Sequence, residues 1–345
     1  MADQYVLCFG GAISSSSLSS AIDVFKMTAS GVEAATGHGL SLSAARSDLA
    51  AASVGDYVFA MGGYSGGSGS SSSSRVIDIF KVNSDGTFET VTHNLSLSTA
   101  RYDLAAATCG NYVFAMGGRY ASSFSLYNSS AVDIFRVNGD GTFETVTHDL
   151  SLSQARYDMA VTTCGNYVFA MGGYSGGYGY VRNTIDIFKV TENGVEAVTN
   201  HGLTLSVARD ELCATSIGDY VLAMGGYGRQ NRLNTVDVFK VDGDTLSAVT
   251  DHGLALSEAR SELAAASCGN YVLAMGGYDG TNYFNTVDIF ELTDSGFVQV
   301  EDHDLSLSIA RSDFSSATCG NYVFAMGGQS DYSTVSNAID VFQAT

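Results

Sequence analysis

The chain has 345 residues, of which 45% are hydrophobic, and none of its apolar stretches approaches the roughly 18 residues that a membrane-spanning helix needs. This composition predicts a packed globular protein. The formal net charge of −20 would repel phosphate backbones and anionic lipid surfaces, so neither nucleic acid nor a membrane is expected as a partner.

One short peptide, Tyr-Val-Phe-Ala-Met-Gly-Gly, recurs along the whole chain. Near-identical or looser copies start at Tyr5, Tyr57, Tyr112, Tyr167, Tyr220, Tyr271 and Tyr322. Their spacing of 51 to 55 residues indicates one supersecondary unit that is copied along the chain. We therefore expect residues 1–345 to form a single repeat domain.

Each period contains four short apolar runs, here named a, b, c and d, and none is long enough for a good helix. In the second period they cover residues 48–53, 57–63, 76–82 and 88–95. Gly55-Asp56 between runs a and b suits a two-residue hairpin turn, because such pairs tolerate positive φ. The pattern predicts an all-β chain built from four-stranded antiparallel units.

These features resemble a kelch-repeat β-propeller. The resemblance covers nearly the whole chain and depends on a Gly-Gly pair that ends run b, an aromatic residue six positions before the second glycine, and an arginine that opens run a. It implies one four-stranded blade per period. The family usually has a Trp in run d, and this chain has none, so lighter packing of the outer strands is expected. The similarity among the copies resembles kelch-like arrays encoded by gut bacteria and their phages.

The number of blades depends on how the runs are shared out, because runs b and c occur seven times and runs a and d six times. In a six-bladed ring the last run a, at 313–318, completes the first blade, and the hairpin at 319–344 is left over. In a seven-bladed ring the first blade has no inner strand and the last has no outer strand. We expect six blades, because loss of an innermost strand would open the core.

Cysteines and histidines occupy repeated positions. Four cysteines precede the a–b turn in different blades, too far apart for disulfides, so six free thiols are expected: Cys8, Cys109, Cys164, Cys213, Cys268 and Cys319. The histidines fall one per period at the end of run d, and we expect them to bond to the turn: His38, His93, His148, His201, His252 and His303. Side chains on separate blades cannot converge on one ion, so no metal and no cofactor are predicted.

An arginine opens run a in six periods, and an acidic residue follows two positions later. Residues two apart in a strand point to the same side, and run a is rich in alanine and should lie innermost. The pattern predicts a ring at one mouth of the channel, which either bridges neighbouring blades or holds an anionic ligand. The arginines are Arg46, Arg101, Arg156, Arg209, Arg260 and Arg311, and the acids are Asp48, Asp103, Asp158, Glu211, Glu262 and Asp313.

The b–c loops differ in every copy and should share one face with the d–a connections. Their Tyr, Ser, Gly, Asn and Arg content is typical of antibody paratopes. Free drift of the loops would explain the Ser-Gly stretch at 66–74 but not the aromatic residues elsewhere. The predicted ligand-binding residues are Tyr120, Phe124, Tyr127, Tyr174, Tyr178, Tyr180, Arg182, Tyr227, Arg229, Arg232, Tyr278, Tyr283 and Tyr332.

Two functions follow from these patterns. The first is a non-enzymatic recognition module that binds a protein or a glycan through the loops. The second is a structural protein that self-assembles head to tail through unpaired terminal strands. No Ser-His-Asp order, zinc signature or phosphate-binding loop occurs, so an enzyme is not expected. Run b begins four residues after Met1, which leaves no room for a signal peptide, so we expect cytoplasmic synthesis, with display on a phage or cell surface as a further hypothesis.

Overall fold

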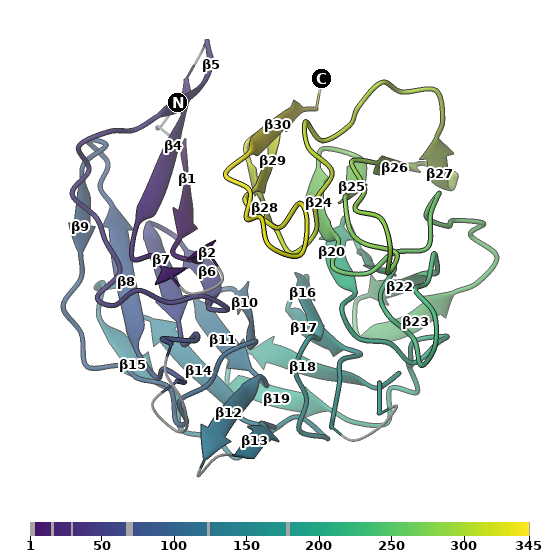
Figure 1. Cartoon of the computed structure of the whole chain (residues 1–345). Coiled ribbons are helices and arrows are strands. Elements are labelled where there is room, and N and C mark those ends of the chain that lie inside the picture. The colour runs from purple at the N-terminus through teal and green to yellow at the C-terminus, as the bar shows by residue number, and fades with distance from the viewer. Residues whose placement is uncertain are drawn as a thin grey trace. The chain divides into compact units, whose positions relative to one another are not determined.

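A computed structural model describes residues 4–14, 17–28, 30–66, 72–122, 125–176 and 180–344. The chain divides into two compact units, which we call the N-terminal unit (residues 1–157) and the C-terminal unit (residues 158–345). Throughout the described ranges the ordered elements are β-strands (Figure 1). A helix with the length and apolar character to span a membrane is absent from these ranges.

The N-terminal unit holds three antiparallel sheets, each of which is one blade. The first consists of β1 (Gln4–Phe9), β4 (Ile22–Thr28) and β5 (Gly31–Ala34). The second consists of β6 (Ala50–Val54), β7 (Tyr57–Met61), β8 (Ile77–Val82) and β9 (Phe88–Thr90). The third consists of β10 (Ala105–Cys109), β11 (Tyr112–Met116), β14 (Val132–Val137) and β15 (Phe143–Thr145). Two small hairpins lie in the b–c loops: β2 (Ala12–Ser14) with β3 (Ser17–Leu18), and β12 (Arg119–Ser122) with β13 (Ser125–Asn128).

The C-terminal unit holds four further sheets. The fourth blade consists of β16 (Ala160–Cys164), β17 (Tyr167–Met171), β18 (Ile185–Thr191) and β19 (Gly194–Val198). The fifth consists of β20 (Cys213–Ile217), β21 (Tyr220–Met224), β22 (Val236–Asp242) and β23 (Thr245–Val249). The sixth consists of β24 (Ala264–Cys268), β25 (Tyr271–Met275), β26 (Val287–Thr293) and β27 (Gly296–Val300). The seventh consists of β28 (Ser315–Cys319), β29 (Tyr322–Met326) and β30 (Ile339–Gln343).

The predicted fold class is confirmed in its all-β, four-stranded antiparallel form, but the prediction of six blades was wrong, because the described residues form seven blade sheets besides the two small loop hairpins. The last run a, β28, does not complete the first blade. It pairs along its whole length with β29, to which a short Gly320-Asn321 turn joins it directly. Val323 and Phe342 of the seventh blade also belong to the buried cluster that contains Met275 of the sixth, so one face of the last hairpin packs onto the sixth blade.

Except in the first blade, the run b strands are buried along most of their length, because hydrophobic side chains cover both of their faces. All five residues of β17 are buried, and each sheet shares a core layer with the next one in its unit. In the layer between the fourth and fifth blades, Phe169 and Ile187 pack with Val221 and Phe239. The continuous apolar run of the repeated peptide therefore encodes a strand that lies between two neighbouring blades.

Rings in the outer strands pack onto the preceding blade, at the position where the family usually carries Trp. Phe143 lies edge-on to Tyr57 at 5.0 Å between ring centroids, and Phe297 lies edge-on to Tyr220 at 5.2 Å. Such aromatic pairs stabilise by about 0.5–1.5 kcal/mol beyond the area that they bury. Where run d carries an aromatic residue, its ring thus attaches the outer strand to the blade before it.

The Gly-Gly pair that ends run b allows each blade to pack closely against the next. Gly276 and Gly277 both have positive φ, at +58° and +109°. A Cβ on Gly276 would lie 2.6 Å from the carbonyl oxygen of Arg311, and the amide of Gly277 donates to that same oxygen at 2.9 Å. Only glycine allows the backbones of the sixth and seventh blades to approach this closely.

The b–c loops and the d–a connections share one side of the blades, as predicted. In the sixth blade the loop that begins at Tyr278 pairs with Ser261, which lies just before β24. The end of the same loop accepts backbone hydrogen bonds from the d–a connection that follows, with Leu307 donating to Asn285 and Arg311 donating to Phe284. The variable loops are therefore anchored at both ends to the repeated framework.

Candidate functional site

The six arginines of the predicted ring lie fully buried inside their own blades. Arg260 donates from Nη2 to Asp288 of β26 at 2.6 Å and to the carbonyl oxygen of Ala274 at 3.2 Å. Arg101 pairs with Asp133 in the same way, and Arg311 pairs with Asp340 at 2.7 Å. These side chains join strands within one blade instead of bridging two blades, and their burial separates them from any ligand at a channel mouth.

The sequence pattern suggested that the acidic residue two positions after each arginine continues the strand, but in the structure it does not. Every one of these residues has a positive φ, between +49° and +56°, so the same-side rule for residues two apart in an extended strand does not apply to it. In the C-terminal unit their backbones form a chain of hydrogen bonds, from Glu211 to Asp158, from Glu262 to Glu211 and from Asp313 to Glu262, at 3.0 to 3.1 Å. We call Asp158, Glu211, Glu262 and Asp313 the acidic row.

The carboxyl groups near this row have raised pKa values. Burial and, to a lesser extent, the adjacent Glu211 raise the pKa of Asp210 to about 7, although Arg232 opposes the change. Burial and the neighbouring Glu262 raise the pKa of Glu211 itself. In the N-terminal unit burial raises the pKa of Asp103 to about 6. Desolvation and like charge both disfavour the ionised form of a carboxyl group, so these residues lie in a strongly negative and poorly hydrated environment.

Predicted loop residues converge beside the acidic row. The guanidinium of Arg232 lies between two rings, 4.6 Å from the centroid of Tyr227 and 5.3 Å from that of Tyr278. Tyr278 contacts Tyr283 at 4.8 Å between centroids, and its hydroxyl is hydrogen-bonded to that of Tyr332, which raises the pKa of Tyr278 to about 12. We call these five residues the tyrosine–arginine cluster. A guanidinium at these distances from two aromatic rings makes favourable cation–π contacts, which link the two loops.

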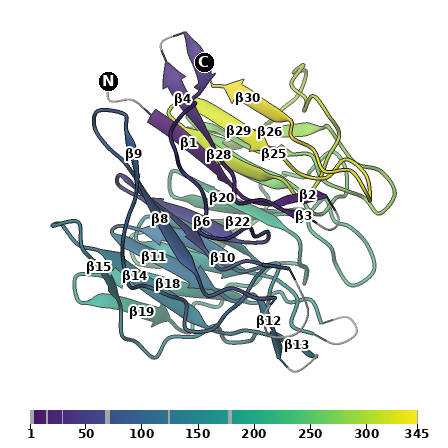
Figure 2. The same cartoon turned by 60° about the vertical axis from the view of Figure 1, so that its left-hand side comes forward.

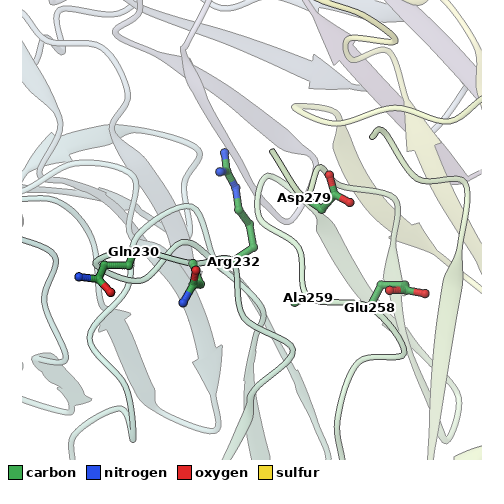
Figure 3. A pocket seen from close by; sticks show the side chains of 6 residues that line it. Gln230, Arg232, Glu258, Ala259 and Asp279 are labelled. Carbon is green, nitrogen blue, oxygen red and sulfur yellow. The ribbon is translucent and has the colours of Figure 1, made fainter. Parts of the chain in front are cut away.

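A cavity of 350 Å³ lies next to this cluster in the C-terminal unit. Its lining consists of Gln230, Asn231, Arg232, Glu258, Ala259 and Asp279. Figure 3 shows Gln230 and Arg232 on one side of the cavity and Glu258 and Asp279 on the other. Asp279 accepts the backbone amides of Thr281 and Asn282 at 2.7 and 2.6 Å, which fixes the loop that forms this wall. The cavity is polar and bears more negative than positive side chains.

The N-terminal unit carries a related arrangement. Arg119 lies between the rings of Tyr102 and Tyr157, at 5.0 and 4.4 Å, and its Nε donates to Asp103 at 2.6 Å. In the adjoining hairpin, Tyr120 and Tyr127 stack at 5.5 Å between centroids. Figures 1 and 2 show this hairpin, β12 and β13, set off from the sheet of its blade. An arginine held between tyrosines thus occurs in both units.

The remaining predicted loop residues are more dispersed. Arg182 lies 5.6 Å from the ring of Tyr180, Tyr174 pairs with Val181, and Arg229 is exposed. Phe124 and Tyr178 lie outside the described residues. Sequence reasoning missed Tyr102, Tyr157 and Asp210. All three lie between the arginine and the acid of the Arg-x-acid motif. This position varies within an otherwise repeated motif, and that variability could have identified the three residues as candidates.

The predicted turn-bonding role of the histidines is confirmed in five repeats. In each case Nδ1 accepts the backbone amide of the leucine two residues later, at 3.0 to 3.1 Å, as in the bond from Leu95 to His93. All six cysteines are free thiols, and burial raises the pKa of Cys213 to about 12 and that of Cys164 to about 11. In the part of the chain that the structure describes, no three His, Cys, Asp or Glu side chains are grouped so as to hold a metal ion.

Comparison with known proteins agrees with this architecture. The family model described as the KLHDC2/KLHL20/DRC7 Kelch-repeats domain matches residues 104–328, well over half of the chain. No curated protein matches the sequence. Kelch β-propellers are typically protein-binding scaffolds and are generally not enzymes. The matched residues run from the third blade to the Gly-Gly pair of the seventh, and the chain belongs to the kelch-repeat family.

Proposed function

We propose that this kelch protein is a non-enzymatic scaffold that recognises a protein partner through its b–c loops. The observation that carries the proposal is the tyrosine–arginine cluster of the C-terminal unit, in which rigidly held aromatic side chains reach the surface. Tyr332 is 79% exposed, although its hydroxyl is bonded to the buried Tyr278. An exposed ring that is already fixed in position offers contact area at a low entropic cost.

The sequences of the b–c loops also differ from blade to blade, as a specific interface would require. Arg232 can occupy its position in the cluster because Gly280, which has φ +102°, carries no side chain. A Cβ on Gly280 would lie 2.8 Å from Nη1 of Arg232. Tyr and Arg are the residue types that most often dominate the energy of protein interfaces. A protein partner is favoured over a glycan because kelch domains generally bind proteins.

Selection from a random peptide display library on the immobilised full-length chain tests this proposal. We expect peptides that are retained by the natural chain to bind Tyr332→Ser at least about tenfold more weakly, because the substitution removes an exposed interface anchor. Val298→Ser is the matched control, since Val298 is also exposed but lies on the outer strand β27.

Equal binding to Tyr332→Ser and the natural chain would contradict the proposal. A glycan array probed with the same two variants tests whether the ligand is a carbohydrate instead. Glycan binding that depends on Tyr332, with no peptide selected, would overturn the protein partner in favour of a carbohydrate.

A second candidate function, self-assembly, is favoured by the edge strand β30. Among the described strands it pairs only with β29, and its Ile339 and Val341 are 38% and 39% exposed. Their counterparts in the second blade, Ile77 and Ile79, are buried. An unpaired edge with exposed apolar side chains is a template for strand addition by a second copy of the chain.

Light scattering over a range of protein concentrations tests this second function. We expect the natural chain to form species larger than a monomer, and Val341→Lys to remain monomeric because a charge at a strand edge blocks pairing. Val298→Lys, which places the same charge on β27 of the neighbouring blade, should assemble like the natural chain. A natural chain that stays monomeric at every concentration would rule out assembly.

A further inference from the structure

The first blade differs from the other six in the pairing of its run b strand. In the other blades a run a strand lies along one edge of run b and a run c strand along the other, as in the order β6-β7-β8. Among the described strands β1 pairs only with β4, so its edge away from β4 has no strand partner. Leu7 and Cys8 of β1 are partly exposed, whereas their counterparts Phe59 and Ala60 in β7 are fully buried. An open edge of this kind can accept an added strand.

The run c aspartate of the first blade also lacks the arginine that its counterparts hold. Asp78 of the second blade is 7% exposed and pairs with Arg46 at 2.7 Å. The same pair, between run c and the run a of the same blade, is made by Asp133, Asp237, Asp288 and Asp340. Asp23 has the same register, opposite Cys8 as Asp78 is opposite Ala60. Its carboxylate is nevertheless exposed and forms no ion pair or hydrogen bond with any described residue.

Gly11 leaves space beside the same edge. In the second blade, a Cβ on Gly63 would lie 2.7 Å from the carbonyl oxygen of Ser47 and 3.1 Å from Cβ of Leu49, where run a begins. The equivalent glycines of the third, fifth, sixth and seventh blades approach their own run a segments as closely, at 2.5 to 2.8 Å. Gly11 has φ +96°, but a Cβ there would meet no atom within 4 Å. The first blade is therefore open where these blades hold the start of run a.

The second blade borders this opening with an unpaired backbone donor. The amide of Asp103 donates to the carbonyl oxygen of Asp48 at 3.0 Å, and the acidic row continues the same pattern in the C-terminal unit. The amide of Asp48 itself has no acceptor among the described residues. On β6, which follows, Ala51 and Ser53 are exposed. A segment that placed a carbonyl oxygen opposite Asp48 would extend this series of backbone hydrogen bonds to the first blade.

The other blades indicate which sequence fits the opening. Its arginine would donate to Asp23 and to the carbonyl oxygen of Cys8, as Arg46 donates to Asp78 and to Ala60. The positions equivalent to 50–53 hold only Ala, Ser, Thr, Cys or Val in all six copies of run a, so the side chains after the leucine must be small.

We propose that the open edge of β1, with Gly11, Asp23 and the amide of Asp48, binds a segment of a partner protein that reads Arg-x-acid-Leu followed by small residues. The segment would add to β1 as an inner strand. We call this surface the β1 edge site. It is separate from the b–c loops and from the edge of β30. Strand β30 of a second copy does not fit it, since that strand would bring Asp340 and no arginine toward the Asp23 carboxylate.

Fluorescence anisotropy with a labelled peptide tests the proposal on the full-length chain. The probe copies residues 45–54, Ala-Arg-Ser-Asp-Leu-Ala-Ala-Ala-Ser-Val, with blocked ends. We expect it to bind, and a version with citrulline in place of arginine to bind at least about tenfold more weakly, because a charge-assisted hydrogen bond is lost. Asp23→Asn should remove this preference for arginine. Glu33→Gln, which removes the same charge from an exposed position on β5, should retain it.

A pair of glycine variants tests the shape of the site. Gly11→Ala should weaken binding of the probe at least about tenfold, since its methyl group would occupy the space that the start of the segment needs. Gly31→Ala is the matched control. Gly31 also has a positive φ, +128°, and a Cβ there would likewise meet no atom, but it lies in the turn between β4 and β5. Its variant should bind within about twofold of the natural chain, and thermal unfolding checks that both variants are folded.

Three results would overturn the proposal: no binding of the probe, equal binding of the citrulline peptide or of a scrambled peptide of the same composition, or equal weakening by Gly11→Ala and Gly31→Ala. A chain that ignores the probe but forms a dimer, which Asp23→Asn dissociates, would replace the partner segment by a second copy. Tyr332→Ser should bind the probe like the natural chain. Loss of the β1 edge site would therefore leave recognition through the b–c loops standing, and the reverse also holds.

Discussion

Asp288→Ala is expected to lower the free energy of unfolding by about 3–5 kcal/mol, because it leaves the buried Arg260 guanidinium without its counter-ion. Arg260 is fully buried, and Asp288 also accepts the backbone amide of Ser257 at 3.1 Å, so the substitution removes two partners at once. Urea unfolding followed by far-ultraviolet circular dichroism and by tyrosine fluorescence measures the change, the latter because the chain contains no Trp.

The control for this prediction is an ion pair at the surface of the neighbouring blade. Lys240 and Asp242 are 3.8 Å apart and largely exposed. Asp242→Ala should cost less than about 1 kcal/mol, as exposed pairs contribute little. If Asp288→Ala costs no more than Asp242→Ala, the buried arginine–aspartate pairs do not stabilise the individual blades.

Gly276→Ala is expected to lower the free energy of unfolding by more than about 3 kcal/mol, or to prevent folding, since the added methyl group has no space. Its Cβ would lie 2.6 Å from both the carbonyl oxygen of Arg311 and a ring carbon of Phe314, and 2.9 Å from a methyl group of Leu307. The seventh blade would have to move away from the sixth. The midpoint of thermal unfolding by circular dichroism measures the loss.

Gly269 is a matched control for this steric effect. It has the same φ of +58° but lies in the a–b turn of the same blade, where a Cβ would meet no atom within 4 Å. Gly269→Ala should therefore cost only the strain of a left-handed alanine, about 1–2 kcal/mol. Equal losses for the two variants would mean that backbone strain alone, and not the close approach of neighbouring blades, explains the Gly-Gly pair.

The binding surface could be predicted from sequence only in part. The Tyr and Arg content of the b–c loops indicated recognition, and the structure brings Arg232, Tyr278 and Tyr332 into one cluster. Asp210 was not predicted, because a single acidic residue between an arginine and a glutamate has no distinguishing feature in the sequence. Its carboxyl group becomes unusual only through burial. Burial depends on neighbouring blades that are distant in the sequence, so local patterns do not reveal it.

The sequence by itself determined the all-β class, the four-stranded blade, the turn-bonding histidines and the face that carries the variable loops. These properties follow from short-range patterns: alternating apolar runs, turn residues, and Gly-Gly pairs whose positive φ only glycine tolerates. Seven similar copies made each pattern easy to recognise, because chance does not repeat the same residues at a nearly constant spacing.

Only the tertiary structure decided the number of blades and the partners of the arginines. Six and seven blades use the same apolar runs, and the choice depended on whether β28 pairs with β29 or with the first blade. For Arg260, the sequence pattern pointed to a bridge with a neighbouring blade or to an anionic ligand, but the buried guanidinium pairs with Asp288 of β26 in its own blade. Both outcomes depend on packing between segments far apart in the chain, which determines pairing where local sequence permits two solutions.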